Sequence, residues 1–561
     1  MKRILLCLII GFTFIQSYNL YSQFKLNVKV NASNTFRYGN GSEVALGTSE
    51  SHKEYFEELG DVRLFVNDFT FGFRYEFDDP IEFGTSVKGF SRRFVEYTKD
   101  NFNVRVGNFY ELFGKGLALN SFESRGLGFN TQIDGIKLKY SKTIDKVKIN
   151  GEVLGGDLNY NDYLVTGRVE NYGIRAANLN ISPFKPFTLG GSYLYTNGAI
   201  PSGSIISNIQ AEIFEGNFNF NYKSIDLTGS YANKHTLLLP GALNPNYSDP
   251  RGDGGYAAIS FTRPSLGINV DYKNYRFNLV TPDERSSTSP VKALPFQNAP
   301  TCIKEYSWTL LSRYPHPVDF GDEVGLQFDG FYSPKENLTF NVNASLSSRH
   351  YNYQNADTGT LTRYQRIDRS AAFLPSINAP YSPYWEFYAE MEYYYKKNMK
   401  IKIAFGRQYS NTYSITDPSN SDIVTTTNIP VEITYDFLKK YSTKLIAETQ
   451  WVSNSTRLPD QKSFFNEYLS LSVSRSPDII INGTVEISTD KQDPSRPDVS
   501  KMIFNKVFLW GIAEVTYKFS SANSVTFSYG DERGGLKCSS GICRYVNPFH
   551  GFRLMVINNF N

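Results

Sequence analysis

The sequence has no long hydrophobic run after its first twenty residues, since no later window offers about 18 consecutive apolar positions. This absence argues against a membrane-spanning helix in the mature chain. Residues for metal or nucleophilic chemistry are also few, with four cysteines and five scattered histidines among 561 residues. Neither sign of charge dominates, because 58 Lys and Arg face 55 Asp and Glu. This balance argues against nucleic acid as a partner.

The amino terminus predicts a secretory signal. Two basic residues precede a mostly apolar run at 4–15, and Ser22 follows as a small residue. Such a segment is too short to anchor the chain and is typical of a cleavable signal peptide. We predict that residues 1–22 are removed after crossing the inner membrane and that residues 23–561 form the mature protein.

Aromatic residues are abundant and alternate as in β-strands. The chain has 43 Phe and 39 Tyr. In FTFGFRYEF at 69–77, aromatic residues alternate with Thr, Gly, Arg and Glu, and 24–31 and 338–348 show the same period of two. Successive side chains of a strand point to opposite faces, so this period predicts strands with one apolar face.

Short and long connections alternate between these segments, which indicates two different ends. YSPKEN at 332–337 and FDDP at 77–80 are short joints, whereas 349–383 and 409–425 are long and polar. Transmembrane barrels combine alternating strands, apolar toward lipid, with short periplasmic turns and long outer loops. Only a closed barrel satisfies every strand backbone group in lipid.

The sequence therefore predicts an all-β fold. We expect a single closed antiparallel transmembrane β-barrel of about 22 strands, range 20–24, in the bacterial outer membrane, with outer-membrane lipid as its surroundings. A soluble all-β fold is the weaker alternative, because its apolar residues would have to be buried between sheets.

The end of the chain predicts the closing strand of this barrel. The apolar residues of 551–560 that share one face are Phe552, Leu554, Val556 and Phe560. An alternating ending with a terminal aromatic resembles the signal that the barrel-insertion machinery reads. We therefore expect that machinery as a partner, and the last strand to pair with the first.

The segment 101–131 is either two strands or one strand followed by an inward fold. It does not fit a phosphate loop, because the spacing of its glycines and the residue after its lysine differ from that motif. Over 101–140, the order of VG, FGKG, an arginine and DGIKLKY resembles substrate-selective porins of the alginate-export kind, although Asn108 stands where those usually have arginine. The resemblance implies a charged constriction with the candidates Arg105, Glu111, Lys115, Glu123 and Arg125. The alternative is that these charges form ordinary neutral networks.

A second unusual segment, 278–322, mixes apolar and ionisable residues. A connection of this length is usually functional or disordered, and a loop that packs on itself or plugs the barrel explains both properties. Its candidate lumen residues are Glu305, Arg313, His316, Asp322 and Glu323. No second histidine lies near His316, so we expect no metal and no cofactor.

Cys538 and Cys543 in CSSGIC are close enough in sequence to form a disulfide in an oxidising compartment. Two free thiols are the alternative.

Three stretches together resemble an uncharacterised Bacteroidota family of outer-membrane barrels. They are GNFYELFGKGLALNSFESRGLG, NAPTCIKEYSWTLLSRYPHP and ERGGLKCSSGICR. The resemblance implies location and fold over nearly the whole mature chain, and it carries no known activity.

For function, we expect a passive or substrate-selective channel for polar solutes, because the inward face at 339–347 is rich in neutral hydrogen-bonding groups. The alternative is a non-conducting barrel that serves as a surface assembly or secretion partner. We do not expect an enzyme, since the nearest serine–histidine pair, Ser348 and His350, has no acidic residue close in sequence.

Overall fold

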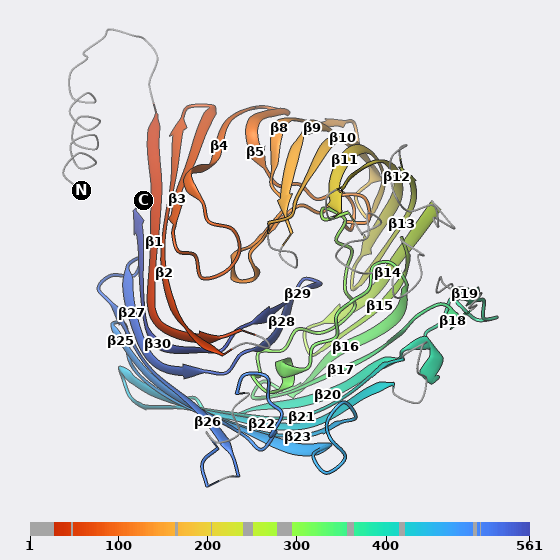
Figure 1. Ribbon diagram of the computed structural model, residues 1–561. Coiled ribbons are helices and arrows are strands. Elements are labelled where there is room, and N and C mark those ends of the chain that lie inside the picture. The colour runs from red at the N-terminus through yellow and green to blue at the C-terminus, as the bar shows by residue number, and fades with distance from the viewer. Residues whose placement is uncertain are drawn as a thin grey trace, which may run out of the picture.

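The chain forms a closed antiparallel β-barrel of 24 strands in the computed structural model. The structure describes residues 27–45, 49–162, 167–202, 205–238, 251–277, 294–355, 364–413, 421–496, 502–504 and 506–560. The last strand pairs with the first, and Figure 1 looks along the resulting ring. The predicted fold is confirmed; the central count of 22 was one hairpin too low. Within the described residues, no helix has the length and apolar character needed to cross a membrane.

The barrel wall consists of long strands that pair with their neighbours in the chain. They are β1 (Val28–Val44), β2 (Glu50–Val66), β3 (Phe69–Asp78), β4 (Lys88–Lys99), β5 (Phe102–Phe109), β8 (Ile133–Ile144), β9 (Val147–Asn161), β10 (Val169–Phe184), β11 (Phe187–Ser202), β12 (Ile205–Tyr222), β13 (Ile225–Leu238), β14 (Arg251–Arg263), β15 (Leu266–Arg276), β16 (Glu323–Lys335), β17 (Leu338–Ser348), β20 (Tyr384–Lys396), β21 (Met399–Thr412), β22 (Asp422–Leu438), β23 (Tyr441–Asn454), β24 (Ser463–Arg475), β25 (Ile479–Ser488), β26 (Phe508–Lys518), β27 (Ser524–Glu532) and β30 (Phe549–Phe560).

Among the residues that the structure describes, six short strands and three short 3₁₀ turns lie outside the wall sheet. They are β6 (Glu123–Ser124), β7 (Phe129–Asn130), β18 (Asn352–Asn355), β19 (Tyr364–Ile367), β28 (Gly535–Ser539), β29 (Ile542–Val546), η2 (Arg125–Leu127), η4 (Leu311–Arg313) and η5 (Ala379–Tyr381).

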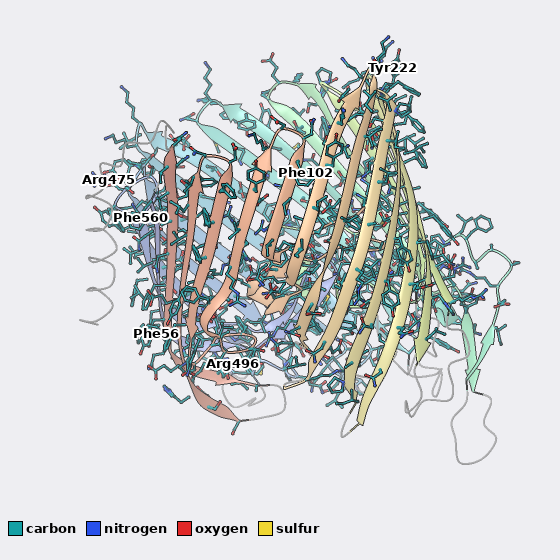
Figure 2. The ribbon with its side chains drawn as sticks, turned by 90° about the horizontal axis from the view of Figure 1, so that it is seen from above. Phe56, Phe102, Tyr222, Arg475, Arg496 and Phe560 are labelled. Atoms are coloured by element: carbon teal, nitrogen blue, oxygen red, sulfur yellow. A yellow bond between two sulfur atoms is a disulfide. The ribbon has the colours of Figure 1, made fainter. Side chains whose placement is uncertain are left out.

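The two ends of the barrel differ in their connections. At the short-turn end, the links between strands are at most five residues long, as at 67–68 and 519–523. The long-loop end carries connections such as 110–132 and 349–383. Figure 2 shows these two ends, with Phe102, Tyr222 and Arg475 at the first and Phe56 and Arg496 at the second. The predicted alternation is present.

One joint was assigned to the wrong end. The last two residues of FDDP, Asp79 and Pro80, begin a connection at 79–87 that belongs to the long-loop end. This connection is nine residues long and is not a tight turn, because β4 starts only at Lys88. The alternation of β3 continues through Asp78, whose buried side chain faces the lumen. The sequence pattern therefore does not show at which end of the barrel this strand stops.

The outer face of the wall is apolar and the inner face is largely polar. In β3, Phe69, Phe73 and Tyr75 are exposed outside, whereas Glu76 and Asp78 are buried inside. This is the reverse of a soluble protein, and it matches a wall whose outside meets hydrocarbon and whose backbone is fully paired.

Three connections of the long-loop end fold into the lumen instead of outward (Figure 1). We call them the first insert (110–132, between β5 and β8), the second insert (294–322, before β16) and the third insert (533–548, which contains the β28–β29 hairpin). Of the two alternatives for 101–131, the structure shows one wall strand followed by an inward fold. The third insert was not anticipated.

Candidate functional site

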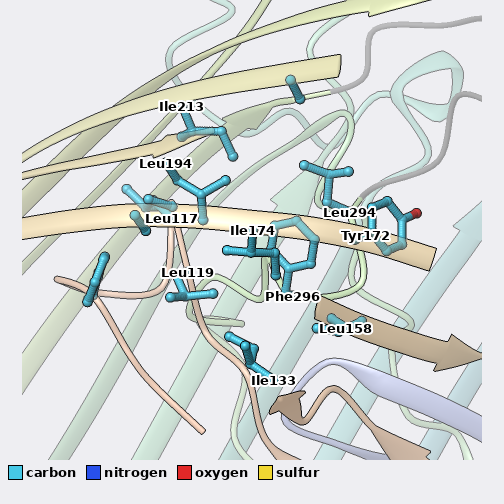
Figure 3. Packing of buried hydrophobic residues seen from close by; sticks show 14 of the residues in the cluster. Leu117, Leu119, Ile133, Leu158, Tyr172, Ile174, Leu194, Ile213, Leu294 and Phe296 are labelled. Carbon is cyan, nitrogen blue, oxygen red and sulfur yellow. The ribbon is translucent and has the colours of Figure 1, made fainter. Parts of the chain in front are cut away.

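A hydrophobic core fills one side of the lumen, next to strands β9–β13. Leu117 and Leu119 of the first insert and Leu294 and Phe296 of the second meet apolar side chains that point inward from the wall (Figure 3). The wall residues labelled there are Ile133, Leu158, Tyr172, Ile174, Leu194 and Ile213. We call this side the filled half of the lumen.

Side-chain hydrogen bonds to backbone lock the first and second inserts together. Gln297 Nε2 donates to the carbonyl oxygen of Leu117 at 2.7 Å. Asn120 Nδ2 donates to the carbonyl oxygen of Asn298 at 2.8 Å, and Asn298 Nδ2 donates to that of Asn120 at 3.1 Å. These bonds satisfy backbone groups that have no strand partner, as buried polar groups require.

The FGKG motif of the first insert wraps around a carboxylate of the wall. Glu215 of β12 accepts hydrogen bonds from the backbone N–H groups of Lys115, at 3.3 Å, and Ala118, at 3.1 Å. Gly114 has a φ of +52°, and a Cβ atom there would lie 2.1 Å from Glu215 Oε1. Only glycine permits both the left-handed backbone and this approach. The motif therefore binds a carboxylate, and this carboxylate is the side chain of Glu215 in the same chain.

The second insert is held to the opposite wall by two polar residues of β23. Glu448 accepts the backbone N–H groups of Thr309 and Leu310, both at 2.8 Å. Gln450 Nε2 donates to the carbonyl oxygen of Leu310 at 2.7 Å. Trp308 adds a hydrogen bond from its indole N–H to the hydroxyl of a wall tyrosine. The insert is thus fixed by a handful of side-chain bonds.

Arg533 anchors the base of the third insert. Its buried guanidinium pairs with Glu486 of β25 at 2.6 Å and with Asp493 at 2.6 Å. Arg313 of the second insert pairs with the same Glu486 and donates to the carbonyl oxygen of Gly534 at 2.9 Å. The second and third inserts therefore share one wall carboxylate.

The tip of the third insert is the β28–β29 hairpin, in which Cys538 and Cys543 form a disulfide. Glu305 of the second insert accepts the backbone N–H of Ser540 at 2.6 Å. The hairpin is therefore bound by polar side chains at its base and at its tip, and Ile542 of β29 packs in the core of the filled half.

A cavity of about 590 Å³ lies between these two inserts and the wall strands β20, β21 and β24–β26. Its lining combines both signs of charge with aromatic and amide groups, including Lys304, Glu305, Tyr306, Tyr468, Asn482, Thr484, Glu514 and Lys537. We call this side the hollow half of the lumen. A space of this size and lining can hold a small polar solute.

The predicted charges around the first insert all lie in the lumen, and most are neutralised there. The ion pairs, with their N–O distances, are Arg105–Glu96 (3.4 Å), Glu111–Lys137 (2.8 Å), Glu123–Arg74 (2.8 Å) and Arg125–Glu76 (2.8 Å). Burial raises the pKa of Glu111, but hydrogen bonds with Glu152, Lys137 and Lys139 outweigh it and hold that pKa below its ordinary range. The Lys115 ammonium lies 5.9 Å from the ring centre of Tyr256. Four of the five predicted charges are thus paired with an opposite charge of the wall.

The predicted residues of the second insert divide between two places. Glu305, Arg313 and His316 line the cavity. Glu323 is buried behind it, with Lys273 Nζ at 2.6 Å and His316 Nε2 at 3.2 Å. Its place at the start of β16 makes it part of the wall.

The fifth residue of that set, Asp322, contacts the histidine considered for catalysis. Asp322 Oδ1 lies 2.9 Å from His350 Nδ1, whereas His350 Nε2 faces Asn274 Oδ1 at 3.0 Å. Ser348 donates to a backbone carbonyl and does not bond the histidine. An orienting acid thus exists 28 positions away in the chain, but serine, histidine and acid do not form a relay.

In the described part of the chain, no group of three or more His, Cys, Asp or Glu residues could hold a metal ion. Burial raises the pKa of the free Cys302 to about 12, so it stays a thiol at neutral pH.

Several solved outer-membrane receptors are similar to the chain in overall structure. The siderophore receptor PirA from Pseudomonas aeruginosa is 7% identical, with 95% of this chain and 81% of that chain covered and a TM-score of 0.42. The FrpB iron transporter from Neisseria meningitidis is 9% identical, with 95% and 82% covered and the same score. Likenesses this distant carry no argument about the function of the chain. No curated protein matches the chain.

One family model spans residues 1–560, and its description is "Family of unknown function (DUF6029)". The predicted membership of an uncharacterised family is confirmed, while the Bacteroidota origin and the likeness to alginate-export porins stay predictions. The chain belongs to this family of unknown function, DUF6029.

Proposed function

We propose that the protein is a bacterial outer-membrane barrel that acts as a substrate-selective channel for small polar solutes. The apolar outer wall supports the membrane location, and the short-turn end would then face the periplasm. The long-loop end, from which all three inserts fold into the lumen, would face the outside of the cell. Cleavage after Ser22, which would deliver the chain to this membrane, lies outside the described residues.

The observation that carries the proposal is the cavity of about 590 Å³ in the hollow half. Two inserts bound it, and both are held by side chains and not by strand pairing. A few such bonds can break without opening the wall, so a path along this side can widen while the barrel stays closed. Because Lys304 and Glu305 bring both signs of charge to the lining, the path favours neutral or zwitterionic solutes.

Planar-bilayer recordings test this proposal. In one variant, a short Gly-Ser linker replaces the hairpin 535–546; in the matched control, the same linker replaces 455–462, a loop at the same end. We expect small conductance steps for the natural chain, larger steps for the hairpin variant and unchanged steps for the control. Absence of conductance in both the natural chain and the hairpin variant would refute the proposal.

A non-conducting role in surface assembly or secretion is the second candidate. The filled half favours it, because a packed core across part of the lumen leaves no room there for solute. This role requires a stable partner in native membranes. Cross-linking and pull-down that recover only the monomer would count against it.

A further inference from the structure

In the long-loop connection between β17 and β20, the described residues 349–355 and 364–383 turn outward and lie against the outside of the barrel. Figure 1 shows its short strands β18 and β19 beyond the ring of wall strands, and Figure 2 shows them beside the wall. The part that follows β19, residues 368–383, contains η5 and leads back into the wall at β20. We call residues 368–383 the outer segment.

Hydrogen bonds fix the outer segment to outward-facing wall residues. The Tyr272 hydroxyl of β15 donates to the carbonyl oxygen of Phe373 at 2.7 Å. The N–H of Ser376 donates to Ser348 Oγ at 2.9 Å. Tyr272 and Ser348 point outward, because the side chains of their neighbours, Lys273 and Ser347, are buried on the lumen side. The segment therefore has a set position on the outer face.

The outer segment presents three large apolar side chains to its surroundings. Phe373 is 62% exposed, Leu374 46% and Ile377 72%. Phe387, on the apolar outer wall of the adjoining β20, is 42% exposed. The three side chains of the segment are thus at least as exposed as Phe387 on the outer wall. A fixed apolar patch of this kind is unusual on a surface that meets water.

The patch adjoins a row of aromatic and leucine side chains on the outer wall. Along the strand register, Tyr272 pairs with Leu326, Leu326 with Leu346, and Leu346 with Trp385. Trp385 stacks on Tyr409 with ring centres 5.8 Å apart. Tyr and Trp are enriched on the outer wall at the boundary between lipid tails and headgroups, and leucine suits the lipid side of that boundary.

We propose that the outer segment rests in the outer leaflet of the membrane, with Phe373, Leu374 and Ile377 among the lipid chains. Its occupant is lipid and not a partner protein, because the patch extends the lipid-facing wall without a break. Arg369, held 4.8 Å over the ring of Tyr381, places a cation where acidic headgroups lie. The segment then fixes the depth and rotation of the barrel in the bilayer. This inference rests on the membrane location proposed above.

Fluorescent probes on single cysteines test the inference in the full-length protein. In a Cys302→Ser background, an environment-sensitive dye is attached to Ile377→Cys, Phe387→Cys or Asp460→Cys, and each protein is placed in liposomes with nitroxide-labelled lipid. Phe387 reports on the wall, and the exposed Asp460 reports on a loop of the same end that connects β23 and β24. We expect quenching at 377 to match that at 387 and to exceed that at 460 several-fold.

The controls separate the two proposals. A probe at 387 that escapes quenching overturns the membrane location itself. If the probe at 387 is quenched but the probe at 377 behaves like that at 460, the outer segment lies in water and the inference alone fails. Disulfide-linked dimers of Ile377→Cys, together with quenching at 377 that is lost on dilution into excess lipid, would show a second copy as the occupant and also overturn it.

Discussion

Removal of the Glu448 carboxylate should release the second insert from the wall. This carboxylate accepts two backbone N–H groups, those of Thr309 and Leu310, at 2.8 Å each. A hydrogen bond to a charged group contributes about 1.5–3 kcal/mol, so the pair contributes about 3–6 kcal/mol. Water that enters the vacated space lowers the loss, which makes about 3 kcal/mol the working figure for Glu448→Ala.

A loss of about 3 kcal/mol raises the open population of the insert roughly a hundredfold, since each 1.4 kcal/mol is about a factor of ten. Hydrogen exchange of peptides from 301–318, followed by mass spectrometry, measures this population directly. Channel recordings should show more frequent or longer open periods in the same variant. Both effects follow because the insert borders the cavity of the hollow half.

The matched control is Glu432→Ala. Glu432 is also a wall carboxylate, but it pairs with Lys400 at 3.3 Å and Lys444 at 3.0 Å and touches no insert. The Glu432→Ala substitution should leave the hydrogen exchange of residues 301–318 unchanged. Equal exchange in the natural chain and Glu448→Ala, or equal acceleration in both variants, would refute the reasoning.

Further predictions concern the third insert, acid stability and membrane insertion. Arg533→Met leaves the buried Asp493 without this cation and leaves Glu486 with Arg313 alone, which costs about 3–5 kcal/mol, and should expose the hairpin to protease at a lower temperature. Because Glu111 has a lowered pKa, its contribution to stability is complete above the unfolded value of about 4.3 and is lost as pH falls further; protease should therefore cut the first insert only in acid. Deletion of Phe560 and Asn561 should reduce surface levels of the protein more than channel activity per molecule; normal surface levels would contradict this.

The fold was predictable because two simple signals agree along most of the chain. In β24, for example, Phe465 and Leu469 face outward while Asn466 and Ser470 are buried inside, so the period of two is plain in the sequence. The alternation of short and long connections then requires two ends. Closure follows from the need to pair the edges of the sheet.

The contacts within the lumen could not be predicted in the same way. Glu448 meets Leu310 across 138 positions of the chain, and Arg313 meets Gly534 across 221. No local pattern links such residues, and a single sequence offers no covariation to reveal them. The candidates on the inserts were therefore identified without their wall partners, and those partners decide whether a charge is free or neutralised.

The sequence nevertheless contained a signal for the filled half that went unused. In β12, Ile209, Ala211 and Ile213 are buried inside, whereas Asn208, Gln210 and Glu212 alternate with them on the outer face. A lumen face in contact with water would not need apolar residues, so the usual pattern of an apolar outside is reversed in this half of the strand. Such a reversal within a barrel strand thus indicates where inserts form a core with the wall.

Where the wall stays polar inside, as at Asn466 and Glu486, the inserts are only tied by side chains. The polarity of the inward face therefore separates the fixed part of the lumen from the part that can move. The first insert and the start of the second should fold with the barrel and stay in place, since moving them would expose Leu117 and Phe296 to water. The third insert contributes Ile542 to this core, and the end of the second insert packs Trp308 and Leu311 in a smaller cluster with Tyr388 and Ala404 of the wall. Because less apolar surface would be exposed by moving these parts, any solute path is expected on their side.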